Sequence, residues 1–289
     1  MPDPDTRAIP QYYASKTSDI IDKYGPGPRV HFHLGLFDGP LDTTGVTAHA
    51  VRQRLIDAQE RMLTHAADFW NVVAEPPSDL LDIGCGLGGG AIYWAQEHRA
   101  RVTAVTNTPD HIPVITHLAA QAGVHDQVAP LLHDIHTLRL LGRFDAAVAL
   151  ESSGYMDRPK LFDTVRQHLR PGGWFGIEEH FLCRTEWATP VNAYYKTRLG
   201  TLEEYLDAAT RSGFVLEQNE DITDRVLEFW VQSMAWSHMT LEAAEPERGH
   251  TIAPSRLTQS AITHGAFFRA WREHALETRL LQFRLPADL

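Results

Sequence analysis

A glycine-rich turn directly follows the apolar run at residues 80–83, and its residue types suggest ligand chemistry. The segment reads Asp82-Ile83-Gly84-Cys85-Gly86-Leu87-Gly88. Gly84 and Gly86 have no Cβ, so the backbone can turn sharply and a ligand can approach it closely. The helix expected next, at 88–97, offers free N–H groups at its N-terminus. This pattern is typical of a loop that binds an adenine-bearing cofactor.

Two further positions help to select the cofactor. A nicotinamide dinucleotide is usually held by an acidic residue at the end of the second strand. Here that strand ends in Thr106-Asn107, which can bind a sugar hydroxyl but carries no carboxylate. After the third strand stands Asp134-Ile135, a carboxylate suited to the adenine amine and an apolar side chain suited to its ring. These positions favour S-adenosylmethionine; a nicotinamide cofactor and a plain structural turn are the alternatives.

Short apolar runs alternate with amphipathic stretches beyond the glycine loop. Strands are expected at 80–83, 101–106, 128–132, 144–150 and 174–178, with helices at 88–97, 111–122 and 159–169. The alternation predicts an α/β fold with a doubly wound, Rossmann-like parallel sheet. Ligands bind such sheets at the carboxyl ends of the strands. Residues 180–210 and the aromatic-rich 226–271 interrupt the pattern, so we expect them to cover that edge.

The residues before the first strand predict a separate helical layer. Helices are expected at 12–24 and 45–74, so residues 1–74 form an N-terminal arm and helical cap before an α/β domain at 75–289. Tyr12 and Tyr13 are expected to fold over the cofactor; an aromatic staple onto the body is the alternative. An arm of this kind can exchange between subunits, and we expect a homo-oligomer.

Composition excludes several classes of partner. The net charge of −11 argues against nucleic acid and against a polybasic membrane-surface mode. The 2 cysteines form no CxxC pair, so neither a disulfide framework nor a structural zinc site is expected. No apolar run approaches the roughly 20 residues that span a bilayer, and the N-terminus does not read as a signal peptide. We expect a soluble, cytoplasmic protein with no membrane partner.

Titratable residues follow the fourth and fifth strands. Glu151 stands directly after 144–150, where its carboxylate can stabilise positive charge on a ligand or take a proton. A bond from Glu151 to the cofactor's amino group is the alternative. Glu179 and His180 after the fifth strand can pair as a general base. His31 and His33 share one face if extended, but no third ligand is evident, so no metal is expected.

These features together resemble the class I S-adenosylmethionine-dependent methyltransferases over residues 78–180. The glycine loop, Asp134 and Arg170-Pro171-Gly172-Gly173 before the fifth strand carry the resemblance. It implies a Rossmann-like methyltransferase sheet with an N-terminal helical arm and an α-rich substrate cover. It also implies an enzyme, with S-adenosylmethionine as the methyl donor.

A narrower resemblance is to the geranyl diphosphate and other terpenoid C-methyltransferases. The stretch at 30–36 is similar to their His-rich segment, and 151–155 to their Glu-Ser-Thr-x-Tyr. Tyr155 stands where many nitrogen and oxygen methyltransferases have His. The resemblance implies methyl transfer to an isoprenoid double bond through a carbocation, with or without cyclisation. A small-molecule O- or N-methyltransferase, with His180 or Glu179 as base, is the alternative.

The resemblance has one departure that bears on the substrate. The family's Tyr-Trp-Glu-Leu-Arg becomes Phe-Trp-Val-Gln-Ser at 229–233. Lys196, Arg198 and Arg225 are the candidates to bind a diphosphate, and a neutral prenylated substrate stays open. Mg²⁺ is expected only with a diphosphate.

The sequence predicts both catalytic and cofactor-binding residues. Catalytic roles are expected for Glu151, Tyr155, Glu179 and His180. Cofactor contacts are expected from Tyr12, Tyr13, His33, Asp82, Gly84, Gly86, Thr106, Asn107, His111, Asp134, Ile135 and Glu151. Aromatic residues of the cover can stabilise a cation; they are Trp187, Tyr194, Tyr195, Phe229, Trp230 and Trp236. The expected partner is an apolar, isoprenoid-bearing small molecule.

Overall fold

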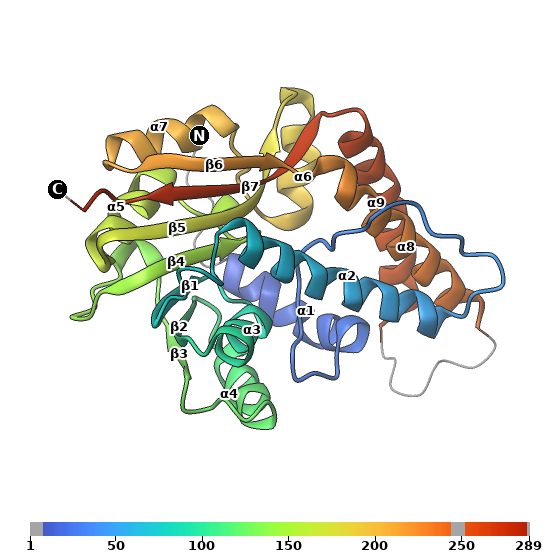
Figure 1. Ribbon diagram of the computed structural model, residues 1–289. Helices are drawn as coiled ribbons and strands as arrows, with labels where there is room; N and C mark the ends of the chain where they lie inside the picture. Colours follow the sequence, from blue (N-terminus) through green and yellow to red (C-terminus); the bar gives the residue numbers. More distant parts are fainter. Residues whose placement is uncertain (1–7, 244–251, 288–289) are drawn as a thin grey trace.

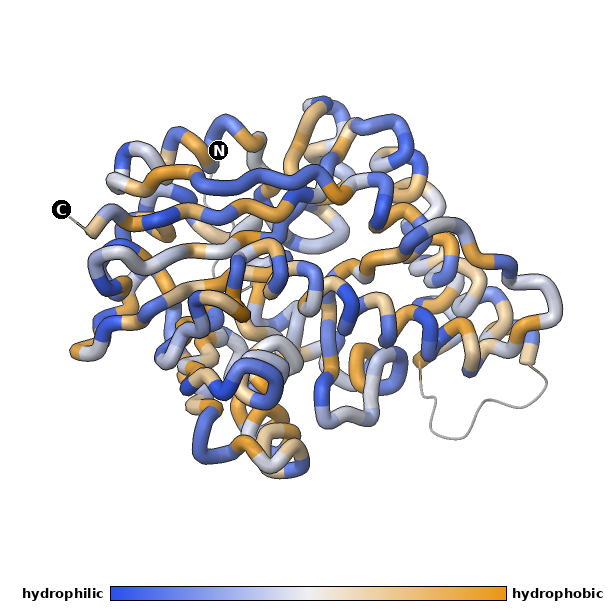
Figure 2. The backbone as a smooth tube through the Cα atoms, in the orientation of Figure 1, coloured by the Kyte–Doolittle hydropathy of each residue, from blue (hydrophilic) through white to orange (hydrophobic). Residues whose placement is uncertain are grey.

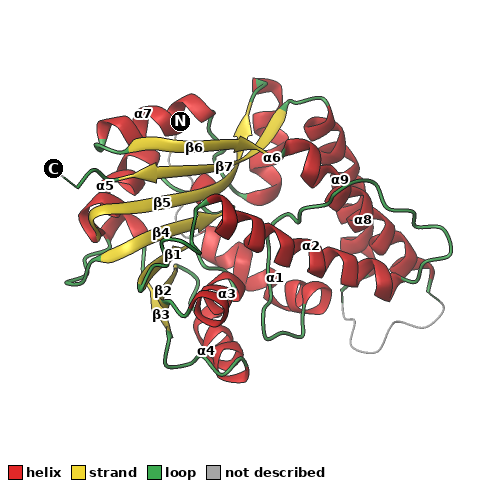
Figure 3. Ribbon diagram, viewed as in Figure 1, coloured by secondary structure: helices red, strands yellow, loops and turns green. Residues whose placement is uncertain are grey.

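A mixed β-sheet with helices on both faces forms the body of the protein, and further helices gather beyond one side of it (Figures 1 and 3). The computed structural model describes residues 8–243 and 252–287. Within these ranges the strands are β1 (Asp79–Ile83), β2 (Arg101–Thr106), β3 (Val128–Leu132), β4 (Phe144–Leu150), β5 (Leu169–Leu182), β6 (Val215–Asp221) and β7 (Leu276–Arg284). The helices are α1 (Ala8–Tyr24), α2 (Ala48–Phe69), α3 (Gly89–His98), α4 (His111–Gln121), α5 (Arg158–His168), α6 (Ala188–Tyr195), α7 (Leu202–Arg211), α8 (Thr223–Glu242) and α9 (Pro254–Arg272).

The described strands form one 7-stranded sheet in the order β3-β2-β1-β4-β5-β7-β6. Strands β1 to β5 run parallel, and β7 is antiparallel to both of its neighbours, β5 and β6. The predicted α/β fold with a doubly wound parallel sheet is therefore confirmed. All five predicted strands are present, and β5 extends further on both sides than the predicted 174–178.

The sequence did not predict β6 and β7. Strand β6 is exposed at nearly every position and is hydrophilic along most of its length, so no buried face marks it (Figure 2). Strand β7 follows two long helices and pairs with β5, far away in sequence. Both strands are held by partners that only the folded chain brings near.

Two apolar clusters fill the space on the two faces of the sheet. Successive strand residues belong to opposite clusters: Leu80 and Trp174 lie on one face, and Leu81 and Phe175 on the other. The first cluster joins the sheet to α2, α3 and α4, and the second joins it to α5 and α7. Burial on both faces explains why the central strands read as continuous apolar runs.

Helix α2 shows how the N-terminal layer is built. The Thr47 hydroxyl caps it by accepting from Ala50 N at 3.2 Å. Val51, Leu55 and Met62 are completely buried along one stripe, as the spacing in the sequence predicts. Helices α8 and α9 pack on each other, and α8 also packs on α2. None of the helices that the structure describes is long and apolar enough to cross a bilayer.

The stretch at 180–210, expected to cover the carboxyl edge, is divided between two places. Its first residues end β5, and α6 carries Tyr194 and Tyr195 toward the ligand cavities described below. Helix α7 instead packs beside α5 on the face of the sheet, where Tyr205 is buried among Phe162 and Phe175. Helix α7 thus belongs to the sheet layers rather than to the cover, because its apolar face matches the second cluster.

Close contact between β5 and Trp70 gives a stability prediction. A Cβ on Gly176 would come within 2.5 Å of the Trp70 indole ring. We expect Gly176→Ala to lower the free energy of unfolding by about 1–3 kcal/mol through overpacking. Gly142→Ala is the matched control, because a Cβ there meets no described atom within 4 Å. Urea unfolding curves measure both; equal stabilities of the two variants would contradict the packing described.

Candidate active site

Two cavities lie side by side at the carboxyl ends of the parallel strands. The larger, of about 530 Å³, is lined by the glycine loop, by residues after β2 and β3, and by Glu151. The smaller, of about 170 Å³, is lined by residues of α1, α6, α8 and α9. Ile20, Phe32, His33 and Glu151 line both cavities. These residues form a common wall, which we call the junction.

The glycine loop makes the sharp turn that its sequence predicts. Gly84 and Gly86 have φ values of 71° and 54°, in the left-handed region that favours glycine. The N–H groups of Gly84 and Cys85 both donate to Val105 O, which closes the loop over the end of β2. A Cβ on Gly86 would meet no described atom within 4 Å, so this residue faces open space in the larger cavity.

Nearly all expected cofactor contacts surround the larger cavity. The residues concerned are Tyr13, His33, Asp82, Gly84, Gly86, Thr106, Asn107, His111, Asp134, Ile135 and Glu151. Tyr12 lines the smaller cavity instead, because successive residues of α1 point in different directions. The structure therefore brings the expected set together, with Tyr12 moved to the neighbouring cavity.

Polar groups of the larger cavity suit an S-adenosyl ligand. Asp134 accepts from His136 N at 3.0 Å and keeps a half-exposed carboxylate toward solvent and cavity. His111 Nε2 is buried without a hydrogen-bond partner among the described residues. Burial raises the pKa of Asp82 to about 7, so a cationic ligand group beside it would stabilise its ionised form. The residues present therefore fit the expected methyl donor.

Helix α1 closes the larger cavity through a tyrosine pair. The Tyr13 hydroxyl donates to the Tyr155 hydroxyl at 2.6 Å, and the rings meet edge to face with centroids 5.7 Å apart. Burial and Tyr13 raise the pKa of Tyr155 well above its ordinary value, so it stays a neutral phenol. Tyr155 lines the larger cavity, as its expected role requires.

Glu151 is held at the junction by three contacts, one from the segment after α1 and two from β5. Its φ of 44° is unusual for a residue with a side chain, and its N–H donates to Glu178 O at 2.8 Å. Its Oε1 accepts from Leu34 N at 2.5 Å, and its Oε2 lies 3.4 Å from His180 Nε2. The carboxylate is thus fixed between the two cavities.

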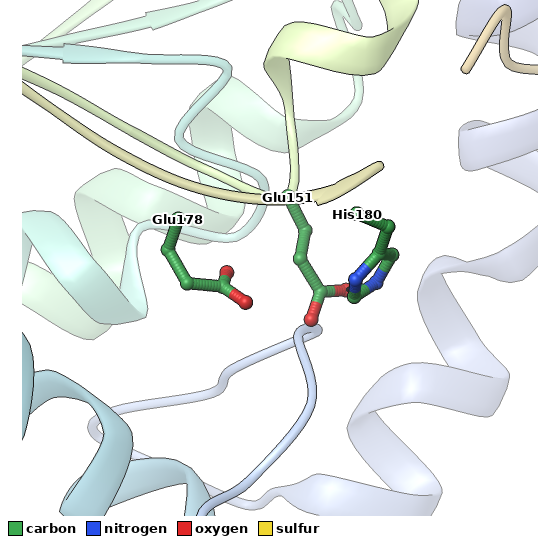
Figure 4. A group of neighbouring side chains, drawn as sticks. All are labelled: Glu151, Glu178 and His180. Atoms are coloured by element: carbon green, nitrogen blue, oxygen red, sulfur yellow. Dashed lines mark ion pairs between the residues drawn. The ribbon is translucent and has the colours of Figure 1, made fainter. Parts of the chain in front are cut away.

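Strand β5 places Glu178 and His180 on the same side as Glu151. Figure 4 shows the three side chains directed toward one another. One carboxylate oxygen from each glutamate and one ring nitrogen of His180 all lie within 4.8 Å of one another. Glu178 is fully buried, and both of its oxygens have no hydrogen-bond partner among the described residues. Burial, with Glu151 and Glu179 nearby, raises the pKa of Glu178 well above its ordinary value. Burial therefore favours the protonated form of Glu178 in the folded protein.

The Glu179 and His180 side chains, expected to pair as a general base, lie on opposite faces of β5. The alternation of β5 turns the Glu179 side chain to the opposite face, where it accepts from Gly154 N, Ser153 Oγ and His180 N at 2.6, 2.9 and 2.8 Å. Neither Glu179 nor His180 is among the described residues that line the cavities. Burial acts to lower the pKa of His180, but the Glu151 carboxylate outweighs it and the pKa is raised. The His180 ring therefore lies beside Glu151, and the Glu179 carboxylate binds the loop after β4.

The smaller cavity has an aromatic wall and a cluster of cations. Its rings include five of the six aromatic residues expected for the cover; Trp187 lines neither cavity. Lys23 is only 8% exposed, and its Nζ lies 5.1 Å from the ring centroids of both Tyr24 and Trp236. Burial lowers the pKa of Lys23 to about 7. Lys16 and Arg256 line the same cavity, and Arg256 pairs with Asp19 at 2.5 Å.

The basic residues expected to bind a diphosphate are not in this cavity. Lys196 is exposed at the end of α6, and Arg225 pairs with Asp38 and Glu220 outside it. Arg198 likewise lines neither cavity among the described residues. The sequence missed Lys16, Lys23 and Arg256 because they lie in α1 and α9, which meet only through tertiary packing.

Comparison with known proteins finds a matching family model over part of the sheet. Residues 80–173 match a family model described as "Methyltransferase domain". The sterol 24-C-methyltransferase of Gibberella zeae is 29% identical over 159 residues, 50% of this chain and 42% of that protein. The chain thus spans less than half of the length of this sterol relative.

Two bacterial relatives match over more of the chain. The geranyl diphosphate 2-C-methyltransferase of Streptomyces lasalocidi is 26% identical over 213 residues, 69% of each protein. The 27-O-demethylrifamycin SV methyltransferase of Amycolatopsis mediterranei is 26% identical over 260 residues, 87% of this chain and 90% of that protein. The relatives therefore include both carbon and oxygen methyltransferases.

A solved structure shares the whole fold. The geranyl diphosphate C-methyltransferase of Streptomyces coelicolor A3(2), in complex with Mg²⁺, geranyl diphosphate and S-adenosyl-L-homocysteine, superimposes with a TM-score of 0.75 at 18% identity. The superposition covers 99% of each chain. The shared fold includes the helical layer beyond the sheet as well as the sheet itself.

The two neighbouring glutamates of β5 give opposite stability predictions. Folded Glu178 keeps a proton that the unfolded chain releases above its ordinary pKa of about 4.3. Wild-type stability therefore falls as the pH rises beyond that value, and Glu178→Gln removes this loss. From pH 5 to 8 we expect the free energy of unfolding of Glu178→Gln to rise relative to that of the wild type, by at most about 1.4 kcal/mol per pH unit.

Glu179→Gln serves as the matched comparison. Its amide N–H₂ would face the donors that Glu179 now accepts from, at a cost of about 1–3 kcal/mol. Urea unfolding at both pH values measures the two variants. A Glu178→Gln variant that is destabilised like Glu179→Gln would show that Glu178 is ionised in the folded protein.

Proposed function

We propose that this chain, which carries a methyltransferase domain, uses S-adenosylmethionine to methylate a carbon–carbon double bond of an isoprenoid substrate. The reaction passes through a carbocation, which ends by proton loss or by cyclisation. The observation that supports this most is Glu151, a carboxylate at the junction between the donor cavity and an aromatic-walled cavity.

The larger cavity is proposed to hold the methyl donor. S-adenosylmethionine supplies an electrophilic methyl group on a positively charged sulfur. Asp134 and Ile135 are placed for the adenine, and Thr106 with Asn107 for the ribose hydroxyls. Asp82 and the glycine loop are left for the methionine part. This orientation directs the sulfur toward the junction, and such positioning supplies much of the acceleration in methyl transfer.

Glu151 then acts on the charge that develops in the substrate. An alkene is a weak nucleophile, and its attack on the methyl group leaves a positive charge on the neighbouring carbon. A fixed carboxylate at a site screened from water stabilises that charge far more than it would in bulk solvent. The faces of Tyr24, Phe229 and the other rings of the smaller cavity add cation–π stabilisation.

The cations of the smaller cavity favour a substrate with an anionic head, such as a prenyl diphosphate. A buried ammonium is costly unless an anion accompanies it, and no carboxylate in the described part of the chain pairs with Lys23. Lys16 and Arg256 lie in the same wall. Glu151 at the junction and Lys23 would then hold the two ends of one elongated substrate, with Mg²⁺ required only for a diphosphate.

Methyl transfer to oxygen or nitrogen is the second candidate. The relative that acts on a rifamycin aligns over most of the chain and supports it. That chemistry needs a base in contact with the substrate. Glu179 and His180, the bases expected from the sequence, are outside the lining of both cavities.

An assay with methyl-labelled S-adenosylmethionine tests the proposal. The panel is prenyl diphosphates, prenylated alkaloids and phenols, and we expect label on carbon of a prenyl group. Glu151→Gln should lower turnover about 100-fold or more while changing the Kd for S-adenosylmethionine little, because it removes transition-state stabilisation. Glu186→Gln, an exposed residue, is the control. Label only on oxygen or nitrogen would reject the carbon chemistry, and unchanged turnover would remove Glu151 from the mechanism.

A second variant tests whether the substrate carries an anionic head group that Lys23 binds. Lys23→Gln should raise the KM for a prenyl diphosphate about tenfold or more and leave a neutral prenylated substrate nearly unaffected. Lys196→Gln changes a lysine that is exposed, and it should alter neither value. Equal effects of Lys23→Gln on charged and neutral substrates would show that the lysine has only a structural role.

A further inference from the structure

A series of polar side chains runs from Glu151 into the protein behind the junction. Strand β5 places the His180 ring beside this residue, with Nε2 3.4 Å from Glu151 Oε2. On its other side the same ring bonds Thr278 of β7, with Nδ1 3.0 Å from Oγ1. Trp271 of α9 donates its Nε1–H to the same Thr278 oxygen at 2.8 Å. Elements β5, β7 and α9 thus support one carboxylate.

The register of the sheet fixes how His180 and Thr278 meet. The two residues are direct partners in the antiparallel pair of β5 and β7, so their side chains lie on the same face. Thr278 is completely buried, and its backbone N–H donates to Thr223 Oγ1 at 3.0 Å. The Trp271 ring lies edge to face on the His180 ring, with centroids 5.1 Å apart. The imidazole is therefore held by a hydrogen bond at one edge and by an aromatic ring beside it.

The donor and acceptor types in this series fix the direction of its protons. A tryptophan N–H can only donate, so the Thr278 oxygen accepts from Trp271. In a neutral imidazole the Thr278 O–H then donates to Nδ1, and the ring proton is on Nε2. The opposite neutral tautomer would turn a lone pair toward Glu151 and leave the Thr278 hydrogen without an acceptor. An imidazolium carries a proton on both nitrogens, so in either favoured state an N–H of His180 points at Glu151.

We propose that Thr278 is a positioning residue for methyl transfer, which acts through His180 to keep the Glu151 carboxylate directed at the junction. This inference rests on the carbon methylation proposed above. It gives a role to a residue outside the described lining of both cavities. Leu34 N holds Oε1 and His180 holds Oε2, so the carboxylate is oriented before a substrate binds. A charge oriented in advance stabilises a developing cation without reorganising in the transition state.

Loss of the Thr278 hydroxyl would release the imidazole without removing it. Thr278→Val keeps the shape of the side chain but leaves His180 Nδ1 and Trp271 Nε1 without their shared partner. The imidazole can then turn about its Cβ–Cγ bond, since this torsion has broad minima. Oε2 of Glu151 thereby loses a fixed donor, while Leu34 N still holds Oε1. We therefore expect a slower chemical step with unchanged binding.

Kinetics of Thr278 variants test the assignment, with the panel member that the wild type methylates on carbon. We expect Thr278→Val to lower the single-turnover rate of methyl transfer about tenfold. The KM for the substrate and the Kd for S-adenosylmethionine should change by less than about twofold. Thr278→Ser restores the hydroxyl, and its rate should be within about threefold of the wild-type rate.

Thr197→Val is the matched control for loss of a buried threonine hydroxyl. The Thr197 hydroxyl is buried and has no hydrogen-bond partner among the described residues. Thr197 is also outside the described lining of both cavities. This variant should keep the wild-type rate.

Nitrogen-15 NMR of His180 in the intact wild-type protein tests the direction of the protons independently of catalysis. A proton on Nε2 at neutral pH, in a neutral ring or an imidazolium, supports the assignment. A neutral ring with its proton on Nδ1 overturns it. This measurement decides the matter even if Thr278→Val does not fold.

The kinetic outcomes separate this inference from the function beneath it. Wild-type label only on oxygen or nitrogen rejects the function and the inference together. Label on carbon, with the wild-type rate kept by Thr278→Val, supports the function and overturns the role of Thr278. A Thr278→Ser variant as slow as Thr278→Val also overturns it, because the shape of the side chain rather than its hydroxyl would then set the rate.

Discussion

Glu151 is held where two cavities meet, and the geometry of the site follows from that placement. The residue ends β4 with φ at 44°, a conformation that costs on the order of 1–3 kcal/mol for a residue with a side chain. Its three partners come from two places in the sequence: Leu34 after α1, and the Glu178 carbonyl and His180 ring of β5. Leu34 and His180 bind the carboxylate itself, and Glu178 fixes the backbone that carries it.

Successive side chains of β5 point to opposite faces of the sheet, and only alternate ones face Glu151. Glu178 and His180 face Glu151, and Glu179 between them faces the loop after β4, where it binds Gly154 and Ser153. The loop is thereby anchored on one side of β5 while charge is arranged on the other. Helix α1 has a comparable double role, since Tyr13 reaches the larger cavity and Tyr12 the smaller one.

The sequence predicts those parts of the site that are local in the chain. The glycine loop, Asp134 and Glu151 each follow an apolar run, so their meeting at one sheet edge follows from the order of the elements. The five parallel strands are predicted for the same reason, since burial on both faces leaves continuous apolar runs. Strand β6 has no buried face and gave no such signal.

Features that depend on distant packing could not be predicted in this way. Lys23 and Arg256 lie far apart in sequence and share a cavity only because α1 and α9 meet there. The Glu179–His180 pair looked like a base because the residues are adjacent, but adjacency in a strand places side chains on opposite faces. The bond between His180 and Thr278 joins two strands that are far apart in the sequence, and no pattern in the sequence indicates it.

We propose that the methyl donor and the prenyl group meet at Glu151, and a crystal structure with S-adenosylhomocysteine and an unreactive prenyl diphosphate tests this directly. We predict the thioether sulfur at the junction end of the larger cavity and the prenyl chain in the smaller one. The substrate double bond should lie beside Glu151, with its reacting carbon about a methyl group's reach from the sulfur. A sulfur that points away from Glu151, or a prenyl chain bound outside the aromatic cavity, would contradict the account.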